Sequence, residues 1–536
     1  VGHGGRSSGN TVGNTSTMTG DVGVAANGDI LLQGGTGART YTQIGHGGWE
    51  DGSLIMTLGG DISAISQTGL LRLRGGTGSE GYALVGHGSL RNAIGSVPQG
   101  TRSGSIYLEA ANWEITPNGT TALARIGHRS QGANNGLTAG HQFSLIGNGA
   151  DGTTSYLVND AFLTLMGARD HLAAGGGATF GAIGDLVMDL PLTYNSAGDL
   201  HMLATGDLTI LRGTQNAGSG DTNVVAGWDG LTPALDFLDK VPMRIIDIDA
   251  IHADPTAWGN NGGVASIGDG SQTFGVAVGT AGGTTTVLGD AVRLVGSNVA
   301  GNGYAVVGFA PMPGISPTGA LLVAAKEGGI ALQGGGLANT YAHIGHRTLG
   351  NVTASASGAI SVISSGGLDL QGGTALQTSA QIGHGGVAAN PASLGGDILV
   401  EIEEDITMAG GSGSVAYTQI GHGGSATNGN LTGAVRVVTD GDLVVSTTNL
   451  ANLSYAKIGH GDDLRGTSAA QAGTGNRSGD ILVSAGKDIT VQSGMIGHVN
   501  HVSPATATAG STQIGVARLD PRSEEHTSEL QSRQYL

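Results

Sequence analysis

The chain of 536 residues has no cysteine, few aromatic residues and few charges. The absence of cysteine excludes disulfide bonds and thiolate metal sites. Aromatic residues make up 4% of the sequence and charged residues 12%, so Leu, Ile, Val and Ala must supply the buried apolar surface. A formal net charge of −18 disfavours binding to nucleic acid or to anionic membranes, which attract clusters of Lys and Arg. The sequence also lacks the run of about 18 apolar residues that would predict a membrane-spanning helix.

Glycine, by contrast, is abundant, with 101 residues, many of them in phrases of the type "YTQIGHGG". An apolar residue followed by glycine recurs at intervals of 37 to 43 residues, apart from one interval of 57. Such a period indicates stacked repeats, none of which can bury its apolar face alone. The glycine of this pair stands at Gly2, Gly45, Gly86, Gly127, Gly184, Gly227, Gly268, Gly308, Gly345, Gly383, Gly421, Gly459 and Gly497.

Within one repeat, apolar residues alternate with polar or small ones, which is the period of a β-strand. In the repeat that starts at Gly396, the stretches "GDILVEI", "EEDITMAGG" and "AYTQIGHGG" each predict a short strand. We therefore predict an all-β fold, a parallel β-helix (β-solenoid) of about 13 repeats over residues 1–520. One turn per repeat is favoured over two smaller turns, because each repeat contains only three clear strand patterns.

Two stretches and both ends depart from this pattern. Residues 128–183 include the long interval and a second version of the phrase, "LIGNG", which predicts a protruding loop or an extra partial turn. Residues 228–267 keep the usual length but change in composition. We expect both ends to be cuts within a longer protein, because the chain begins inside its own repeat phrase. Residues 521–536 abandon the pattern and are similar to a translated sequencing adapter, so we expect an artefactual, disordered tail.

The recurring histidines are predicted to be structural. An active site is a single constellation, whereas Gly-His-Gly occurs at His3, His46, His87, His384, His422 and His460. From His346 to His498 the histidines are 38 residues apart, so equivalent rings should stack about 4.8 Å apart. The predicted ladder comprises Ile44, Gly45, His46, Gly86, His87, Gly127, His128, Gly345, His346, Gly383, His384, Gly421, His422, Gly459, His460, Gly497 and His498.

Strand alternation assigns a direction to each side chain of the ladder strand. Ile44, Ile344, Ile420 and Ile458 should point inward, together with the histidines two residues later. The residue two positions after Tyr varies among Gln43, His343, Gln419 and Lys457, which predicts a solvent-exposed face. Stacked charged imidazoles would repel one another, so we expect neutral rings that bond to backbone carbonyls and a histidine pKa below about 6.5. Metal binding by the ladder is the less favoured alternative.

Acidic residues supply the other candidate sites. Asp247, Asp249, His252 and Asp254 form the densest acidic cluster, an alternative calcium or acid/base site, although strand alternation favours exposed aspartates beside buried Ile246 and Ile248. The recurring aspartates are predicted to accept backbone N–H groups at turns, with a calcium ladder as the alternative. We expect no cofactor, with calcium as the alternative. These aspartates are Asp29, Asp61, Asp397, Asp480, Asp405, Asp442 and Asp488.

The pairs "GDILVSAGKDITVQSG" and "GDILVEIEEDITMAGG" resemble the β-solenoid shafts of filamentous-haemagglutinin-like exoproteins and autotransporter passenger domains of Gram-negative bacteria. The resemblance covers residues 1 to about 520 and lies in the style of the repeat. It implies a secreted or cell-surface protein, an outer-membrane translocator outside this sequence, and a surface glycan or protein receptor as partner. We expect a structural and adhesive segment without enzymatic activity. A polysaccharide hydrolase or lyase with its site near Asp247–Asp254 is the alternative.

The tail yields the first testable prediction. Removal of residues 522–536 should leave the melting temperature unchanged within error, because this segment continues none of the strand patterns. Thermal melts of the two chains, followed by circular dichroism, provide the measurement. A clear loss of stability on truncation would show that the tail packs against the repeats.

Overall fold

The computed structural model describes most of the repeat region. The described residues are 1–3, 15–48, 55–79, 81–88, 100–118, 123–128, 141–147, 153–157, 162–228, 233–234, 243–244, 262–310, 312–348, 354–387, 391–447, 454–461 and 475–498. The chain divides into two compact units, and each is described by itself. Unit 1 comprises Val1–Arg293 with Val307–Phe309, and unit 2 comprises Leu294–Val306 with Ala310–Leu536. The predicted tail lies outside the described residues.

Unit 1 is built of short strands and contains one helix, α1 (Phe162–Ala173), among its described residues. Its strands are β1 (Thr15–Thr19), β2 (Val22–Ala26), β3 (Ile30–Gln33), β4 (Tyr41–Ile44), β5 (Ile55–Gly59), β6 (Ile62–Arg74), β7 (Tyr82–Val85), β8 (Ile106–Thr116), β9 (Ala124–Ile126), β10 (Gln142–Gly147), β11 (Thr153–Leu157), β12 (Gly177–Ala182), β13 (Asp185–Asp189), β14 (Leu192–Tyr194), β15 (Leu200–Ala204), β16 (Leu208–Ile210), β17 (Thr214–Asn216), β18 (Thr222–Val225), β19 (Pro233–Ala234), β20 (Met243–Arg244), β21 (Val264–Ile267) and β22 (Val276–Thr280).

Two further strands, β23 (Thr285–Val295) and β24 (Ala305–Val307), include residues of both units. The strands of unit 2 are β25 (Leu321–Gln333), β26 (Tyr341–Ile344), β27 (Ile360–Ser364), β28 (Leu368–Gln371), β29 (Ser379–Ile382), β30 (Ser393–Leu394), β31 (Ile398–Ile402), β32 (Ile406–Ala409), β33 (Tyr417–Ile420), β34 (Asn430–Thr432), β35 (Val435–Thr439), β36 (Leu443–Ser446), β37 (Ala456–Ile458), β38 (Arg477–Ser478), β39 (Ile481–Ala485), β40 (Ile489–Gln492) and β41 (Met495–Ile496). Among the described residues, no helix is long and apolar enough to cross a membrane.

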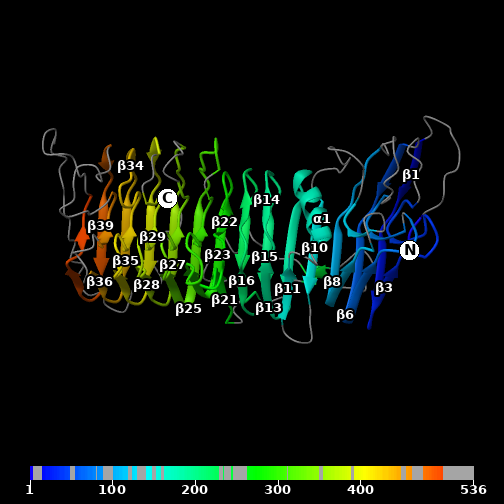
Figure 1. Ribbon diagram of the computed structural model, residues 1–536, viewed down its shortest axis with the longest axis horizontal. Coiled ribbons are helices and arrows are strands. Elements are labelled where there is room, and N and C mark those ends of the chain that lie inside the picture. Colours follow the sequence, from blue (N-terminus) through cyan, green and yellow to red (C-terminus); the bar gives the residue numbers. More distant parts are fainter. Residues whose placement is uncertain are drawn as a thin grey trace. The chain divides into compact units, whose positions relative to one another are not determined.

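The prediction of an all-β chain with large parallel sheets is confirmed. From β27 onward each repeat of unit 2 contributes one strand to each of three parallel ladders, and equivalent strands lie side by side in Figure 1; the long β25 pairs with both β27 and β28. The first ladder runs β27, β31, β35, β39, the second β28, β32, β36, β40, and the third β26, β29, β33, β37, β41. This arrangement is compatible with a β-solenoid. A small fourth ladder of β30, β34 and β38 was not predicted.

The core of unit 2 follows from strand alternation. In β31, Ile398, Val400 and Ile402 are buried, whereas the intervening Leu399 and Glu401 are partly exposed. Ile398 and Val400 pair in register with Val435 and Val437 of the next repeat, whereas Ile402 pairs with the buried Thr439. Stacked aliphatic side chains therefore replace the aromatic residues that the composition lacks.

Unit 1 departs from one turn per repeat. Ala178 of β12 pairs with Leu200 of β15, and Leu200 pairs with Thr222 of β18, so successive strands of this ladder are 22 residues apart. The interval from Gly184 to Gly227 therefore holds two short repeats, where the sequence predicted one. Tight turns join the strands here, without the long segment that follows "GHGG" elsewhere.

The long interval within residues 128–183 contains two additional strands, β10 and β11, and a helix. Strand β10 pairs in parallel with β8 on one side and β12 on the other, which agrees with the predicted extra partial turn. Helix α1 follows β11, and its presence was not predicted from the sequence.

The glycine before each ladder histidine is required by a close backbone approach. Gly421 has a φ of +152°, and a Cβ atom added there would lie 2.1 Å from the carbonyl oxygen of Gly459 in the next repeat. Gly383 is in the same situation, with its added Cβ 2.1 Å from the oxygen of Gly421. Repeats can approach to strand-pairing distance at this corner only because neither side has a side chain.

Substitution of Gly421 should be more damaging than substitution of a glycine that also has a positive φ but has open surroundings. Gly314 also has a positive φ, of +79°, but nothing lies within 4 Å of its added Cβ. We expect Gly314→Ala to lower the free energy of unfolding by about 1 kcal/mol, through backbone strain alone. Gly421→Ala should lower stability by at least about 2 kcal/mol more, because strain is joined by a clash with backbone. Melting curves of both variants test the difference, and equal effects would argue against the close approach.

Candidate functional site

The repeated histidines of unit 2 form a continuous stack, here called the histidine ladder. Adjacent ring centroids are 4.7 to 4.9 Å apart and the ring planes are inclined by 2 to 12°. The rings are held at the spacing of the strands because each histidine follows a strand of the third ladder, two residues after its inward isoleucine. The members are His346, His384, His422, His460 and His498.

The rings of His384, His422, His460 and His498 each accept a hydrogen bond at Nδ1 from the preceding repeat. The backbone N–H of His384 donates to Nδ1 of His422 at 2.9 Å, and the backbone N–H of His422 donates to Nδ1 of His460 at 3.0 Å. His346 and His460 donate in the same way to the following histidine. An Nδ1 atom that accepts a hydrogen bond carries no proton, so these rings are neutral with the proton on Nε2.

The other ring nitrogen bonds to a glycine of the turn before the first strand of a repeat. Nε2 of His422 lies 2.7 Å from the carbonyl oxygen of Gly396, and Nε2 of His384 lies 2.9 Å from that of Gly358. With the Nε2 proton donated and the Nδ1 lone pair engaged, neither nitrogen of these two rings has a lone pair for a metal ion. The geometry therefore gives no support to the metal alternative at His384 and His422.

Unit 1 carries an equivalent ladder. His3, His46, His87 and His128 stack with centroids 4.6 to 5.2 Å apart, and each of the first three donates its backbone N–H to Nδ1 of the next. The stack is extended by His171, whose ring centroid lies 5.4 Å from that of His128. His171 belongs to helix α1 and has no repeat phrase around it, so no sequence signal marked it.

Burial keeps these rings neutral. Loss of solvation lowers the pKa of His87, His346 and His422 to about 4, against an ordinary value near 6.5. Burial, together with neighbouring histidines, also holds the pKa of His384 well below the ordinary value. The ladder isoleucines Ile44, Ile344, Ile420 and Ile458 are buried, as alternation predicts.

The predicted solvent-exposed face of the ladder strand is wrong. Gln43 retains 9% of its surface, while His343, Gln419 and Lys457 are completely buried. The segment after "GHGG" folds back over this face, as shown by Val387, which packs against Tyr417 and Tyr455. It adds a second buried layer, which strand alternation alone does not reveal.

The residues on that face have a common role as donors to turn carbonyls, which the variation in their side chains did not reveal. Nε2 of Gln419 donates to the carbonyls of His422, Gly459 and Gly461, and Nζ of Lys457 donates to those of His460 and Gly461. Each side chain thus satisfies turn carbonyls of its own or the next repeat. The signal available in the sequence was that Gln43, His343, Gln419 and Lys457 all carry N–H donors, although they differ in shape and charge.

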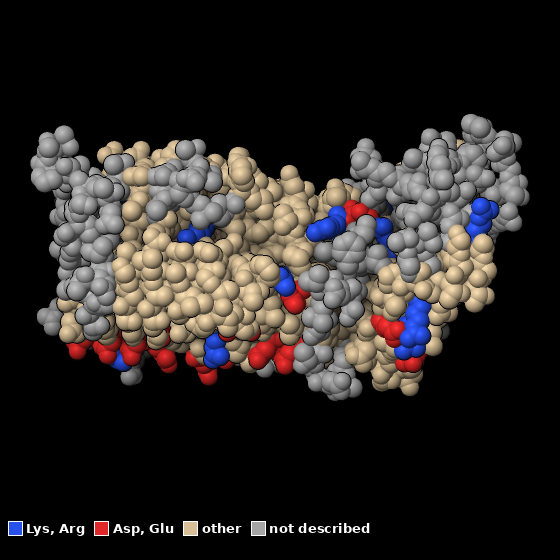
Figure 2. Space-filling view, viewed as in Figure 1, with Lys and Arg blue, Asp and Glu red and all other residues tan. Residues whose placement is uncertain are grey.

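Five of the seven recurring aspartates accept backbone N–H groups at turns. Oδ1 of Asp405 accepts the N–H of Asp442 at 2.8 Å, and Oδ1 of Asp442 accepts the N–H of Asp488 at 2.9 Å. Asp29, Asp61 and Asp397 accept backbone N–H groups of the following repeat in the same way. Figure 2 shows acidic residues in a row along the lower edge of the view. Among the described residues, no group of three or more His, Cys, Asp or Glu side chains is arranged to hold a metal ion.

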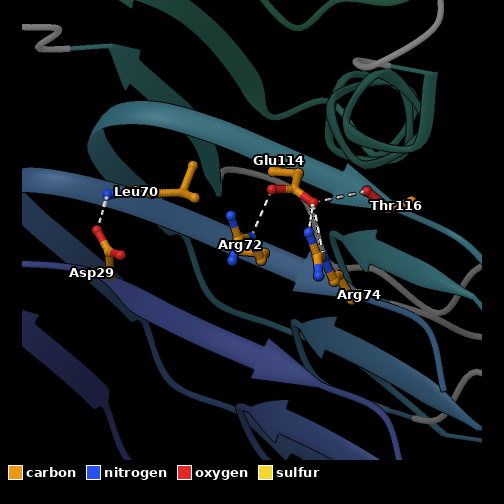
Figure 3. Close-up of polar contacts among 6 residues, drawn as sticks. All are labelled: Asp29, Leu70, Arg72, Arg74, Glu114 and Thr116. Atoms are coloured by element: carbon orange, nitrogen blue, oxygen red, sulfur yellow. Dashed lines mark hydrogen bonds and ion pairs between the residues drawn. The ribbon is translucent and has the colours of Figure 1, made fainter.

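One charged cluster stands out on the surface of unit 1. Glu114 of β8 accepts hydrogen bonds from Arg72 at 2.6 Å and from Arg74 at 2.6 Å, both on the adjacent β6, close to the bond between Asp29 and the N–H of Leu70 (Figure 3). The hydrogen bond from Arg74 lowers the pKa of Glu114. These groups satisfy one another across neighbouring strands, which identifies a cross-strand ion pair.

The predicted acidic site at Asp247, Asp249, His252 and Asp254 lies outside the described residues. Comparison of the chain with family models, with curated proteins and with solved structures gives no match. The functional argument therefore depends on the geometry of the two ladders and of the turns between strands.

The ladder makes stability dependent on pH. The pKa of His422 in the folded chain is about 4, below its unfolded value near 6.5, so the unfolded chain binds the proton first as the pH falls. The contribution of this ring is complete above about pH 6.5 and is lost between pH 6.5 and about 4, at about 1.4 kcal/mol per pH unit. We expect the melting temperature to fall steeply over this interval, which melts at a series of pH values will measure.

His422→Ala should lower the melting temperature at pH 7, because the N–H of His384 and the carbonyl of Gly396 lose their partners and a cavity is left. The variant should also lose less stability than the natural chain between pH 7 and pH 5. Thr407→Ala, on an exposed position of β32, is the control and should alter neither value. An unchanged pH dependence in His422→Ala would show that the ladder does not set it.

Proposed function

We propose that the chain is a structural and adhesive segment of a large secreted or cell-surface protein of a Gram-negative bacterium. Its repeats form a parallel β-solenoid of about 13 repeats over residues 1–520 that extends binding loops from the cell. The observation that supports this role most strongly is the use of the Gly-His-Gly imidazoles. Both nitrogens of His384 and His422 are hydrogen-bonded to the fold, so the most conspicuous motif of the sequence serves cohesion between repeats.

The polar turns support the same role. Asp405 and Asp442 hold the N–H groups of the next repeat, and the glycines of the ladder corner permit backbone contact. The same contacts between neighbouring repeats, made by backbone and short side chains, therefore recur along the array. A shaft that can be lengthened by adding repeats requires such recurring contacts. The segments between strands bind the glycan or protein receptor, because the sequence can change there without altering the ladders. Export through an outer-membrane translocator follows from the resemblance to exoprotein shafts.

A repeat deletion tests the shaft proposal. Removal of residues 384–421 joins Gly383 to His422 and takes out one interval of 38 residues in register. We expect this variant to keep its β-sheet circular dichroism and, when coated on beads, the binding of the parent chain to a glycan array and to extracellular-matrix proteins. Removal of residues 384–420 is the matched control. It shifts the register by one residue, which turns buried side chains outward, and should abolish cooperative melting.

Two outcomes would contradict the proposal. Equal disruption by both deletions would show that the repeats are not interchangeable shaft elements. Release of reducing ends from pectin by the chain, lost in an Asp247→Ala and Asp249→Ala double variant, would establish the polysaccharide-degrading enzyme instead.

A further inference from the structure

An aromatic column in unit 2 is interrupted at one repeat. Tyr304 and Tyr341 stack with centroids 5.0 Å apart, and Tyr417 and Tyr455 stack at 4.7 Å. Strand register places Ser379 between Tyr341 and Tyr417. One position of the column therefore has a hydroxymethyl group where the neighbouring repeats have a phenol ring.

The guanidinium group of Arg347 is stacked at this interruption. Its central carbon lies 3.3 Å from the ring centroid of Tyr341. On another side it is close to the backbone of Gly386, where an added Cβ would lie 3.1 Å from the guanidinium carbon. The side chain thus occupies space that the missing ring of residue 379 leaves, held by a cation–π contact.

This arginine is buried without a counter-charge. Arg347 retains 7% of its surface, and within the described part of the chain its Nε and Nη1 atoms have no hydrogen-bond partner. Among the described ion pairs none includes Arg347. A guanidinium group remains charged in proteins, so the charge cannot be removed by loss of a proton. An unpaired buried charge of this kind is strongly destabilising.

His343, which interacts electrostatically with Arg347, lacks one contact that its counterparts in the following repeats have. In the following repeats the Tyr417 hydroxyl donates to Oε1 of Gln381 at 3.0 Å, and the Tyr455 hydroxyl donates to Oε1 of Gln419 at 3.2 Å. The hydroxyl that would reach residue 343 belongs to position 379, which is serine. His343 is completely buried, and its ring interacts with the backbone of Gly383, so it offers no acceptor of opposite charge to Arg347.

We propose that Arg347 forms a buried binding site for a small monovalent anion of the chloride class. The anion accepts the N–H groups of Nε and Nη1 of the guanidinium and neutralises its charge. A single charge and an enclosed position, between Tyr341 and the segment at Gly386, favour a compact anion over phosphate or a sugar acid. The site goes beyond the proposed shaft function and does not depend on it.

The test compares melting temperatures in sodium chloride and in sodium isethionate at equal ionic strength. We expect chloride to raise the melting temperature by about 2 °C or more in a saturable manner, because a ligand that binds only the folded state stabilises it. Bromide should replace chloride, and crystals grown in bromide should show an anomalous peak within hydrogen-bonding distance of Arg347.

Three variants separate site binding from a general salt effect. Ser379→Tyr restores the ring and the hydroxyl beside His343, and Arg347→Met removes the charge; both should lose the chloride response. Arg436→Met, at an exposed arginine, should keep it. A chloride response that persists in Ser379→Tyr and Arg347→Met, its absence from the natural chain, or a bromide map with only water at Arg347 would each overturn the proposal.

Discussion

Cohesion in this protein depends on a hydrogen bond that crosses between repeats, from the backbone N–H of one histidine to Nδ1 of the next. Because Nδ1 of His422 accepts the N–H of His384, the ring must be neutral and must carry its proton on Nε2. That proton then fixes the turn at Gly396. One side chain thereby joins the end of its own strand, the preceding repeat and the start of its own repeat. Burial of the ring is tolerated because both polar atoms are satisfied.

The three strands per repeat of unit 2 and the inward direction of Ile420 were predictable from the sequence, because period-two alternation and a constant interval of 38 residues encode them directly. The stacking of the histidines follows from the same interval. The 22-residue repeats of unit 1 were not predictable from the position of Gly184 and Gly227, since two short turns span almost the same length as one long turn.

The second buried layer shows a different limit of sequence reasoning. The variable residues of this face, Gln43, His343, Gln419 and Lys457, suggested exposure to solvent. In the structure the position faces turn carbonyls, which require an N–H donor but can be satisfied by several types of side chain. Position 379 shows what happens when one member of a column changes. The loss of a tyrosine ring is accompanied by an arginine from the preceding repeat, and such compensation in space cannot be read from either position alone.

Parallel ladders also determine how unit 2 responds to mechanical force. The hydrogen bonds between repeats run along the stacking direction, so a pull in that direction loads all the bonds of one junction at the same time. The junctions themselves are connected in series, and each carries the whole load. The rupture force is consequently that of the weakest junction and does not increase with the number of repeats. The histidine bond from His384 to His422 adds a tensile link at its junction. Lengthening the array extends its reach, while only better junctions make it stronger.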